Sequence, residues 1–416
     1  MLKAYPRVWV DLRVKEVLYI LMRLLNPASA ASQKGVPEFE RAFAELIGVK
    51  EAVAFTNCRS ALYFSLKALN LEPGSEIIVP AFTFWIDPEV IVMSGHTPVF
   101  VDVDLETLNI DPKLIESAIT PKTKAILATH LNGLPLEMDP IMAIAKKHKL
   151  RLIEDSARTC GGEYKGRRIG SYDIGCFSFG YGKSFYGLGG GMAVSNDPET
   201  IANLRKIQEE SFRTIPIKEL FPAAIKGCLL KFLNNPFFHG FTLFPRVKLW
   251  EQNQDKRYEP WFKVKKPVLT APPDGYFIKM FDIQARLGLR QIRTLDDSNK
   301  KRNAILKFYN QALKGIDDLH LPIDPDDRTH VAVHYSVWSE KKDEMRKYLL
   351  EQRIDAQDES AQDVTQMARY AKYVKGSYPN ANMLEGKVCY IPAHPCLNQG
   401  DITYIAEKIK EYFKKT

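Results

Sequence analysis

Short apolar runs alternate with helix-like segments between residues 36 and 210. The segment EFERAFAELIG is apolar at Phe39, Phe43 and Ile47, a helical spacing that Gly48 closes. Strand-like runs recur as EAVAF, EIIVP, TPVFVDV, KAILATH and RLIED, with helix-like segments such as DPIMAIAKKHK between them. Such runs suit buried, largely parallel strands covered by helices on both faces. The pattern therefore predicts an α/β fold with a large, mostly parallel sheet in a three-layer domain.

The hydrophobic pattern also divides the chain. Residues 1–35 contain an apolar stretch interrupted by charges, which we interpret as an amphipathic arm or helix. We assign residues 36–290 to the large domain, with an apolar insertion at about 215–262. Residues 291–416 follow, and segments such as HYSVWSE, EMRKYLLEQR and DITYIAEKIKEYF predict a smaller α+β domain there.

The insertion combines Leu, Phe and Pro with Lys and Arg. No stretch in it approaches the roughly 20 uninterrupted apolar residues of a spanning helix. Two interpretations stay open. Either the segment is partly buried against the domain or a dimer partner, or residues 219–246 dock on a membrane surface through apolar side chains with basic flanks.

Composition excludes several classes of protein. The chain has 416 residues, of which 45% are hydrophobic and 26% charged, so it can bury a large core. Its formal charge is +8, but Lys and Arg are mixed with Asp and Glu, so we expect no nucleic-acid partner. The six cysteines form no CxxC pair and metal-ligand spacings are absent, so we expect no metal. We predict a cytoplasmic protein, with peripheral membrane association as the open addition.

One segment carries the candidate chemistry. Asp155 follows a strand-like run, Ser178 lies in a short strand, and Lys183 comes five residues later, before a Gly-rich turn. These groups are what pyridoxal 5′-phosphate (PLP) needs: an acid to keep the pyridine nitrogen protonated, a hydroxyl for the phosphate, and an amine that forms a Schiff base and moves protons. Residues 189–191 lack a following P-loop Lys-Ser/Thr, so we interpret them as a tight turn. Asp173 is expected to organise the turn before the Ser178 strand.

The motifs around this segment resemble those of the DegT/DnrJ/EryC1/StrS aminotransferases, which are sugar aminotransferases among the fold-type I PLP-dependent transferases. TNCRSAL, VPAFTF, PVFVDVDLETLNIDP, THLNGLP, IEDSA, GSYDIGCFSF and GGGMAVSND agree in order and spacing. The match runs from about residue 36 to residue 289 apart from the insertion, and more weakly to the end. The resemblance implies a homodimer that transfers an amino group, from L-glutamate by analogy, to the keto or aldehyde group of an activated, nucleotide-linked sugar or a related carbohydrate.

Carried over position by position, the resemblance also implies the roles of single residues. Lys183 would form the Schiff base with the cofactor, and Asp155 would pair with the pyridine nitrogen. Phe84 would stack on the ring and Ser178 would contact the phosphate. The backbone after Asn57 would cradle that phosphate, which agrees with the unpaired amide donors at a helix N-terminus.

Several positions depart from the family pattern. Cys58 and Arg59 replace the usual Gly-Thr, and Arg158 replaces a Gln that lies near the phenolic oxygen of the cofactor. Phe277, within GYFIKM, stands where the family often has an Asn that reaches the phosphate of the neighbouring subunit. Our hypothesis is that Arg59 makes up for that contact, since a guanidinium can bind a phosphate through two bonds. The stretch RIDAQDESAQDVTQM replaces a His-Tyr-Pro stretch of the substrate site.

Two rival functions stay open. A PLP-dependent sugar dehydratase would have His in place of the imine-forming lysine, so Lys183 argues against it. A non-catalytic regulatory or membrane-associated protein is suggested by Arg158, Phe277 and the insertion. The presence of both Lys183 and Asp155 argues against that rival.

Two local alternatives are also open at this level. Trp85 could stack on the cofactor in place of Phe84. His130 follows a strand-like run and is either a satisfied interior histidine or a residue that borders the substrate.

Overall fold

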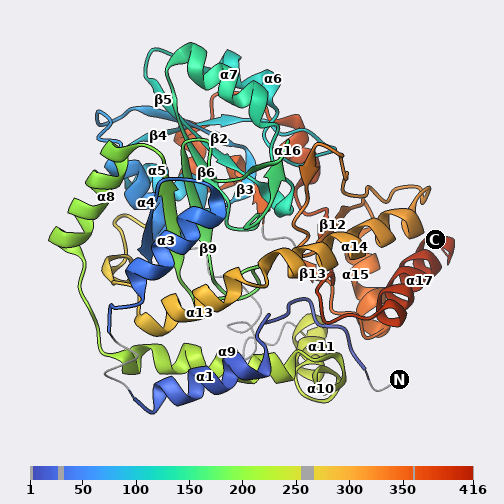
Figure 1. Cartoon of the computed structure of the whole chain (residues 1–416). Coiled ribbons are helices and arrows are strands. Elements are labelled where there is room, and N and C mark those ends of the chain that lie inside the picture. Colours follow the sequence, from blue (N-terminus) through green and yellow to red (C-terminus); the bar gives the residue numbers. More distant parts are fainter. Residues whose placement is uncertain (1–2, 27–31, 254–266, 359–360, 416) are drawn as a thin grey trace.

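The computed structural model describes residues 3–26, 32–253, 267–358 and 361–415 (Figure 1). Its centre is a seven-stranded sheet in the order β1-β10-β9-β6-β5-β2-β4. The strands are β1 (Glu51–Phe55), β2 (Glu76–Pro80), β4 (Thr97–Val101), β5 (Thr123–Thr129), β6 (Arg151–Asp155), β9 (Ile174–Ser178) and β10 (Gly191–Ser195). Strand β10 runs in the direction opposite to the other six strands, which are parallel to one another. The prediction of a large, mostly parallel sheet is therefore confirmed.

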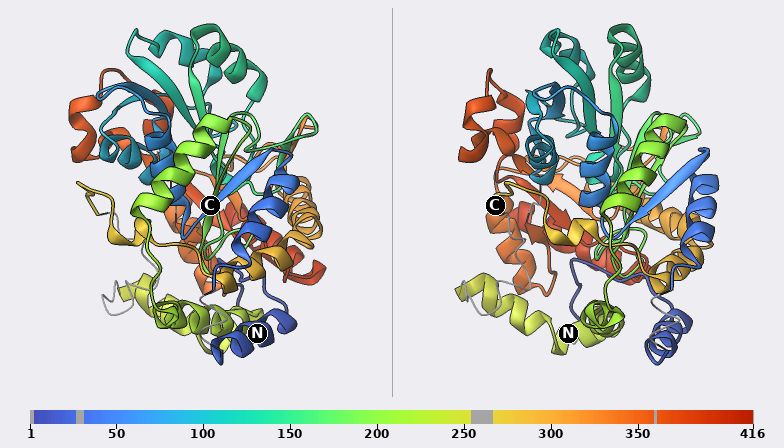
Figure 2. Two further views of the ribbon diagram at one scale, coloured as in Figure 1. Left: turned by 60° about the vertical axis from the view of Figure 1, so that its left-hand side comes forward. Right: turned by 90° about the vertical axis from the view of Figure 1, so that its left-hand side faces the viewer.

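Helices cover both faces of this sheet, because successive residues of a strand point to opposite sides. In β2, Ile77 packs with the core around α4 (Cys58–Ala68) and α5 (Ile86–Met93), whereas Ile78 packs with the core around α7 (Met138–His148). The remaining large-domain helices are α3 (Val36–Ile47), α6 (Pro112–Ile115), α8 (Pro198–Ser211) and α13 (Asp282–Ile292). Figure 2 shows the three layers edge-on. The sheet therefore lies between two layers of helices, as the apolar strands predict.

The C-terminal part has its own core. A three-stranded antiparallel sheet, β12-β15-β13, packs with three helices. These elements are α14 (Leu295–Leu313), β12 (Tyr335–Trp338), α15 (Lys342–Glu351), β13 (Gln357–Asp358), β15 (Val388–Ile391) and α17 (Gln399–Lys415). The chain also returns to the large domain, where β14 (Ala361–Asp363) pairs with β3 (Phe82–Phe84) and α16 (Pro379–Leu384) contacts both strands. The domain boundaries stay a prediction.

Short elements complete the described chain. They are η1 (Glu116–Ala118), η2 (Leu131–Gly133), β7 (Glu163–Tyr164), β8 (Arg167–Arg168), η3 (Ile217–Leu220), η4 (Asp274–Phe277), β11 (Arg328–Thr329), η5 (Val364–Gln366) and η6 (Ala368–Tyr373).

The N-terminal segment is held by backbone hydrogen bonds near its start and by helix packing further along. The Tyr5 N–H donates to the carbonyl of Arg353 at 2.9 Å, and the Ala4 N–H donates to the carbonyl of Pro236 at 2.9 Å. Helix α1 (Val14–Leu24) then packs against α9 and α13. The start of the chain therefore links the insertion to the C-terminal part.

The insertion forms three described helices, α9 (Phe221–Leu233), α10 (Pro236–Phe241) and α11 (Phe244–Asn253). The last part of the expected insertion, up to residue 262, lies outside the described residues. The helices α1 and α9 share one small core, and together with α10 and α11 they form a layer beside the sheet domain (Figures 1 and 2). Within the described ranges, no helix combines the length and the apolar character that crossing a membrane requires.

Candidate active site

A pocket of about 1090 Å³ opens beside the carboxyl ends of the parallel strands. Thr129 ends β5 and Asp155 ends β6, and both line it. Ligands of parallel sheets bind beyond these strand ends. All seven residues that we predict for the site line this pocket: Cys58, Arg59, Phe84, Asp155, Arg158, Ser178 and Lys183.

Lys183 is half-buried and has both a positive neighbour, Arg158, and a negative neighbour, Asp155. Burial, and after it the positive charge of Arg158, lower the pKa of Lys183 to about 8, although Asp155 acts in the other direction. Roughly a tenth of such amines are uncharged at pH 7. The uncharged form attacks carbonyl carbons, so this lysine is prepared for covalent chemistry.

Asp155 is backed by a second buried carboxyl group, which the sequence did not reveal. Asp87, on α5, is fully buried and accepts hydrogen bonds from the hydroxyls of Thr83 at 2.6 Å and Thr129 at 2.7 Å. Burial, and then the charge of Asp155, raise the pKa of Asp87 well above its usual value. The raised pKa favours the protonated form of Asp87 beside Asp155.

The N-terminus of α4 reaches the pocket because a glycine lets it approach the sheet. Asn57 caps the helix, since its side-chain oxygen accepts from the Ser60 N–H at 2.9 Å. A Cβ atom on Gly191 of β10 would lie 2.5 Å from the carbonyl carbon of Asn57 and 2.6 Å from the Cys58 nitrogen. The preceding residues 189 and 190 have positive φ angles of +87° and +109°, which suits glycine. The Gly-rich segment is thus a tight turn with a close chain approach.

The two aromatic candidates differ in position. Phe84 is half-buried and lines the pocket, whereas Trp85 is fully buried and does not line it. Arg59 is exposed, and its guanidinium carbon lies 5.7 Å from the centroid of the Trp85 ring. The structure therefore brings Phe84 to the pocket and keeps Trp85 in the core.

Arg158 lies between Lys183 and the C-terminal part. Its guanidinium carbon is 5.2 Å from the centroid of the Tyr390 ring, and one of its nitrogens is 3.5 Å from Nδ1 of His334. Burial, followed by the charge of Arg158, lowers the pKa of His334 well below its usual value. His334 also lines the pocket, so it is an uncharged neighbour that sequence reasoning missed.

His130 combines both of the alternatives open for it. It is buried, its Nδ1 accepts from the Leu136 N–H at 3.0 Å, and its Nε2 lies 3.2 Å from Glu154. Because Nδ1 accepts, Nε2 carries the proton and donates it to Glu154. The same residue lines the pocket. His130 is thus a satisfied interior histidine with an edge at the site.

Phe277 is partly buried and packs against the hydrophobic core. Its ring centroid is 5.4 Å from that of Phe64 and 6.1 Å from that of Phe212. It does not line the described pocket of its own chain. Its predicted correspondence to an Asn lent to a second subunit stays a prediction.

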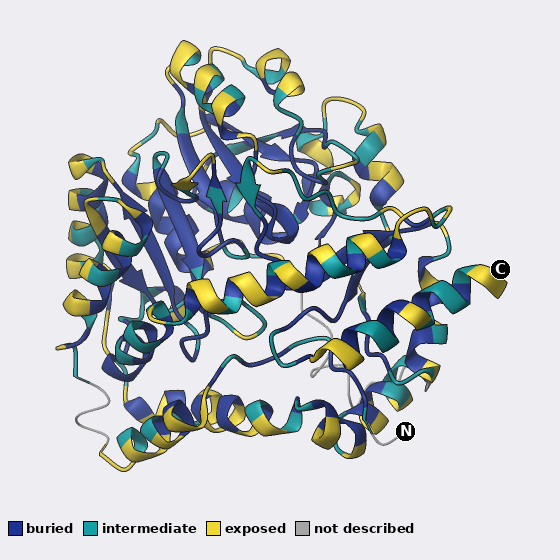
Figure 3. Cartoon of the chain, turned by 45° about the vertical axis from the view of Figure 1, so that its right-hand side comes forward, coloured by how far each residue is buried: buried dark blue, intermediate teal, exposed yellow. Residues whose placement is uncertain are grey.

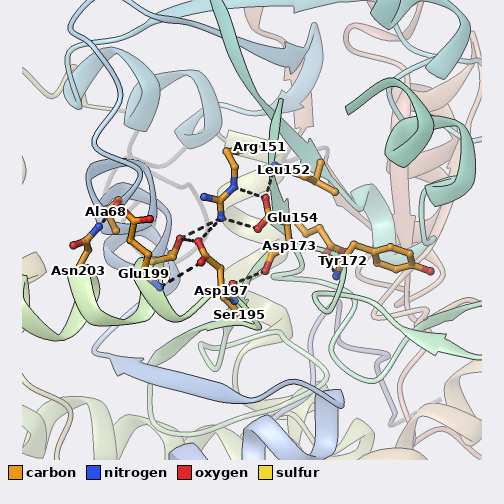
Figure 4. Close-up of polar contacts among 11 residues, drawn as sticks. Ala68, Arg151, Leu152, Glu154, Tyr172, Asp173, Ser195, Asp197, Glu199 and Asn203 are labelled. Carbon is orange, nitrogen blue, oxygen red and sulfur yellow. Dashed lines mark hydrogen bonds and ion pairs between the residues drawn. The ribbon is translucent and has the colours of Figure 1, made fainter. Parts of the chain in front are cut away.

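Asp173 organises the chain before β9, as expected. Its carboxylate accepts from Arg151 at 2.8 and 2.9 Å and from the Leu152 N–H at 2.9 Å (Figure 4). The Ser195 hydroxyl donates to its carbonyl at 2.8 Å. These bonds tie β6, β9 and β10 together, so they hold the strands that carry Asp155 and Ser178.

Three further segments complete the pocket wall, and none of them follows from local sequence motifs. Arg7 comes from the N-terminal segment and donates to Asp355 at 2.8 Å, and both residues line the pocket. Gln357 lines it as well, so part of the stretch that replaces His-Tyr-Pro does reach the site. The third segment is the insertion. Among the described residues, the pocket is lined by two acids, Asp155 and Asp355, and by six basic side chains: Arg7, Arg59, Arg158, Lys183, Lys226 and Arg246.

Comparison with known proteins agrees with this geometry. Spore coat polysaccharide biosynthesis protein SpsC of Bacillus subtilis is 31% identical over 411 residues, which cover 96% of this chain and 95% of that protein. GDP-perosamine synthase of Caulobacter vibrioides is 32% identical over 280 residues, covering 67% and 62%. The crystal structure of S. venezuelae DesV, in complex with a ketimine intermediate, has a TM-score of 0.75 at 26% identity and covers 97% of this chain and 95% of DesV.

A family profile matches residues 16–225 and 249–410, which leaves out residues 226–248 within α9, α10 and α11. The matched part holds all seven predicted site residues. On this extent of agreement, the chain belongs to the DegT/DnrJ/EryC1/StrS aminotransferase family.

Proposed function

We propose that this aminotransferase takes an amino group from L-glutamate and transfers it to the keto or aldehyde group of an activated sugar. The observation that carries the proposal is the gathering of Lys183, Asp155 and the N-terminus of α4 in one cation-rich pocket. Sugar chemistry is supported by relatives whose names include GDP-perosamine synthase and a dTDP-amino-sugar transaminase. In those proteins the sugar is carried on a nucleotide.

Aminotransferases of this family use pyridoxal 5′-phosphate, which supplies an aldehyde to carry the amino group and a ring to accept electrons. The residues of the pocket fit this cofactor. Lys183 offers an amine with a lowered pKa for the aldehyde, and Asp155 offers a buried carboxylate for a protonated ring nitrogen. The α4 N-terminus and the cations offer a phosphate site, since amide donors at a helix start bind anions.

Each predicted residue then has a role. Lys183 would hold the cofactor through its amine and, once released, move the proton of the reaction. Asp155, with the buried carboxyl group of Asp87 beside it, would face the ring nitrogen. Phe84 would pack on the ring.

The remaining predicted residues surround the cofactor. Ser178, Arg59 and the backbone at Cys58 would bind the phosphate. Arg158 would keep the pKa of Lys183 low, so that the free amine forms near neutral pH.

The pocket argues against both rival functions. A dehydratase of the kind with His at the lysine position would not need the amine of Lys183. A regulatory protein would not need Lys183 and Asp155 to remain in one pocket with Asp87 behind them. We therefore favour transamination.

One measurement tests the reaction. Purified holoenzyme mixed with L-glutamate should convert the visible absorbance of the bound cofactor to that of its pyridoxamine form and release the corresponding keto acid. L-lysine, whose side chain carries a positive charge, serves as the comparison donor. An unchanged spectrum with every amino donor would contradict the proposal.

We also propose a homodimer. Arg59 lines the pocket and is nevertheless exposed in the single chain, so a second copy placed over the α4 end would cover it. Light scattering in solution should then give twice the mass of one chain. A single-chain mass at micromolar concentration would contradict this assembly.

The insertion supports a further partner, an anionic membrane surface that residues 219–246 contact. The side chains Phe237, Phe238 and Phe241 of α10 are each about half exposed, at 47, 51 and 55%. Exposed apolar groups on this scale mark interaction sites. On the neighbouring helix α1, Leu18 and Met22 are 55 and 62% exposed.

Charge favours a membrane over a second copy on this face. The sequence from residue 220 to residue 250 contains four cations, Lys226, Lys231, Arg246 and Lys248, and no Asp or Glu. A two-fold interface would place this positive surface against itself, which costs energy. Basic residues beside apolar ones instead suit anionic lipid headgroups. All six cysteines are free, which is consistent with contact from the cytoplasmic side.

A further inference from the structure

Lys183 lies on the irregular loop between β9 and β10. All residues of this loop, 179–189, are described, and none of them belongs to a helix or a strand. Its base is closed by the hydrogen bond that the Phe179 N–H donates to the Gly190 carbonyl at 2.9 Å. A loop that carries a catalytic residue takes its position from the scaffold that surrounds it. The segments packed against this loop therefore decide where the amine of Lys183 lies.

The insertion contacts the loop just before Lys183. One wall of the pocket comes from the strand ends and the start of α4, and a second wall from α9, α10 and α11, mostly from residues 226–248, which the family profile leaves out. In this second wall the side-chain amide of Asn234, at the end of α9, donates to the Tyr181 hydroxyl at 2.9 Å. Asn234 is 2% exposed and Tyr181 is 46% exposed. The buried amide therefore fixes an otherwise exposed side chain two residues before Lys183.

The same helix contacts the loop again just after Lys183. A Cβ atom on Gly227 of α9 would lie 2.2 Å from the Tyr186 hydroxyl oxygen, so the end of this side chain lies against the helix backbone. Tyr186 and Leu188 also share a small hydrophobic core with α9 side chains such as Leu230. Two contacts from one helix therefore lie on either side of Lys183 along the loop.

The N-terminal segment covers the loop between these two contacts. Gly182 has a φ angle of +75°, and a Cβ atom there would lie 3.1 Å from Cγ1 of Val8. Val10 and Leu12, a few residues further on, belong to the same small core as α9. The start of the chain and α9 therefore support the Lys183 loop together.

From these contacts we propose that α9 is a positioning element for Lys183, which it holds through the Asn234–Tyr181 hydrogen bond and the contact of Gly227 with Tyr186. The inference rests on the proposed transamination, and it adds the insertion to the parts of the chain on which that reaction depends. Asn234 and Gly227 act through the loop. Without them the amine is less often at the point from which it moves the proton, and small displacements of a catalytic group are costly.

The first test removes one hydroxyl group from the holoenzyme. Tyr181→Phe should lower the limiting rate of the glutamate-driven absorbance change about tenfold and shift the half-saturating glutamate concentration less than about twofold. Tyr404→Phe is the matched control, because its hydroxyl donates to the Gln352 carbonyl at 3.2 Å outside the pocket, and it should change neither value. Both variants should unfold at nearly the same temperature as the unchanged protein. An unchanged limiting rate in Tyr181→Phe would overturn the proposal.

A second variant separates positioning from a direct contact of Tyr181 with the substrate. Asn234→Ala should slow the reaction as much as Tyr181→Phe does, and the two substitutions together should add nothing, because both remove the same hydrogen bond. Effects that multiply would mean that the two side chains act independently, which refutes the link from α9 to the loop.

The other contact has a test of its own. Gly227→Ala should slow the reaction, because the added methyl group displaces the Tyr186 side chain. Tyr186→Phe in the same chain should restore part of the rate, since it removes the hydroxyl that meets this methyl group. An equally slow double variant would contradict the contribution of this contact.

The position of the amine also has a readout that needs no amino donor. Burial is the largest of the causes that lower the pKa of Lys183 to about 8. The variants leave unchanged the titratable and charged groups that face it, Arg158, Asp155, Cys58, Arg59 and His334. A loop that moves lets water reach the amine, so its pKa rises. In Tyr181→Phe, capture of pyridoxal 5′-phosphate by cofactor-free protein should have its pH midpoint about half a unit higher.

The two measurements fail separately. An unmoved capture midpoint would show that the amine keeps its place without α9, whatever the glutamate reaction does. Should L-glutamate leave the cofactor absorbance of even the unchanged protein as it is, the proposed transamination is wrong, and the capture midpoints of the variants still decide the positioning.

Discussion

The two walls of the pocket differ in how they are held in place. The catalytic wall is built from strand ends and one helix start, and its polar groups are fixed by buried hydrogen bonds such as those around Asp87 and Asp173. The insertion wall is built from helices that bury one apolar side against α1 and leave another exposed (Figure 3). The difference teaches that the predicted catalytic residues and the apolar side of the pocket come from separate parts of this chain.

The largest expected effect lies in the catalytic wall. Lys183→Ala should lower amino transfer about a thousandfold or more, because it removes both the covalent anchor and the proton carrier. It should leave vesicle binding unchanged. The measurement is the rate of the glutamate-driven absorbance change, with Lys206→Ala, an exposed lysine on α8, as the control. Activity retained in the Lys183 variant would mean that the two walls do not divide the work in this way.

The next effect lies in the insertion. Replacing Phe237, Phe238 and Phe241 together by Ser should weaken binding to vesicles that contain anionic lipid by roughly a hundredfold. About half of each Phe is exposed, so inserting it contributes about half of the 1.5–3 kcal/mol of a fully buried Phe. Sedimentation with vesicles of mixed neutral and anionic phospholipid measures it. A chain lacking residues 219–246 that sediments as well as the intact one would eliminate the membrane contact.

The smallest expected effect concerns the pKa of Lys183 in the catalytic wall. The free amine of Lys183 reacts, so capture of pyridoxal 5′-phosphate by cofactor-free protein should accelerate as the pH rises through about 8 and level off above it. Arg158→Gln removes a cation that lowers this pKa, so the midpoint should move upward and capture at pH 7.5 should slow roughly threefold. An unmoved midpoint would show that burial alone sets the pKa. Capture rates followed by absorbance across pH 6 to 10 give the answer.

The sequence predicts those parts of the molecule that are determined by residues close together in the chain. The apolar runs predict β1, β2, β4, β5 and β6 because a strand buried on both faces must be apolar throughout. Lys183, Asp155 and Ser178 are predictable because they share one motif-rich segment.

Contacts between distant segments are not predictable in this way. Arg7 reaches Asp355 across 348 positions of the chain, and no pattern near either residue announces the contact. Asp87 reads locally as an acid at the start of a helix, where such residues are common. Only the folded chain brings it behind Asp155, so its raised pKa follows from tertiary packing.

The glycine at position 191 sets a limit on change in the catalytic wall. Even a methyl group there would collide with the peptide that joins Asn57 to Cys58, so β10 and α4 could not keep their present separation. The damage would fall on the N-terminal end of α4, where we propose that the cofactor phosphate binds. Substitutions meant to reshape the pocket are therefore better tolerated in the insertion, where exposed apolar side chains line it, than at the contact between β10 and α4.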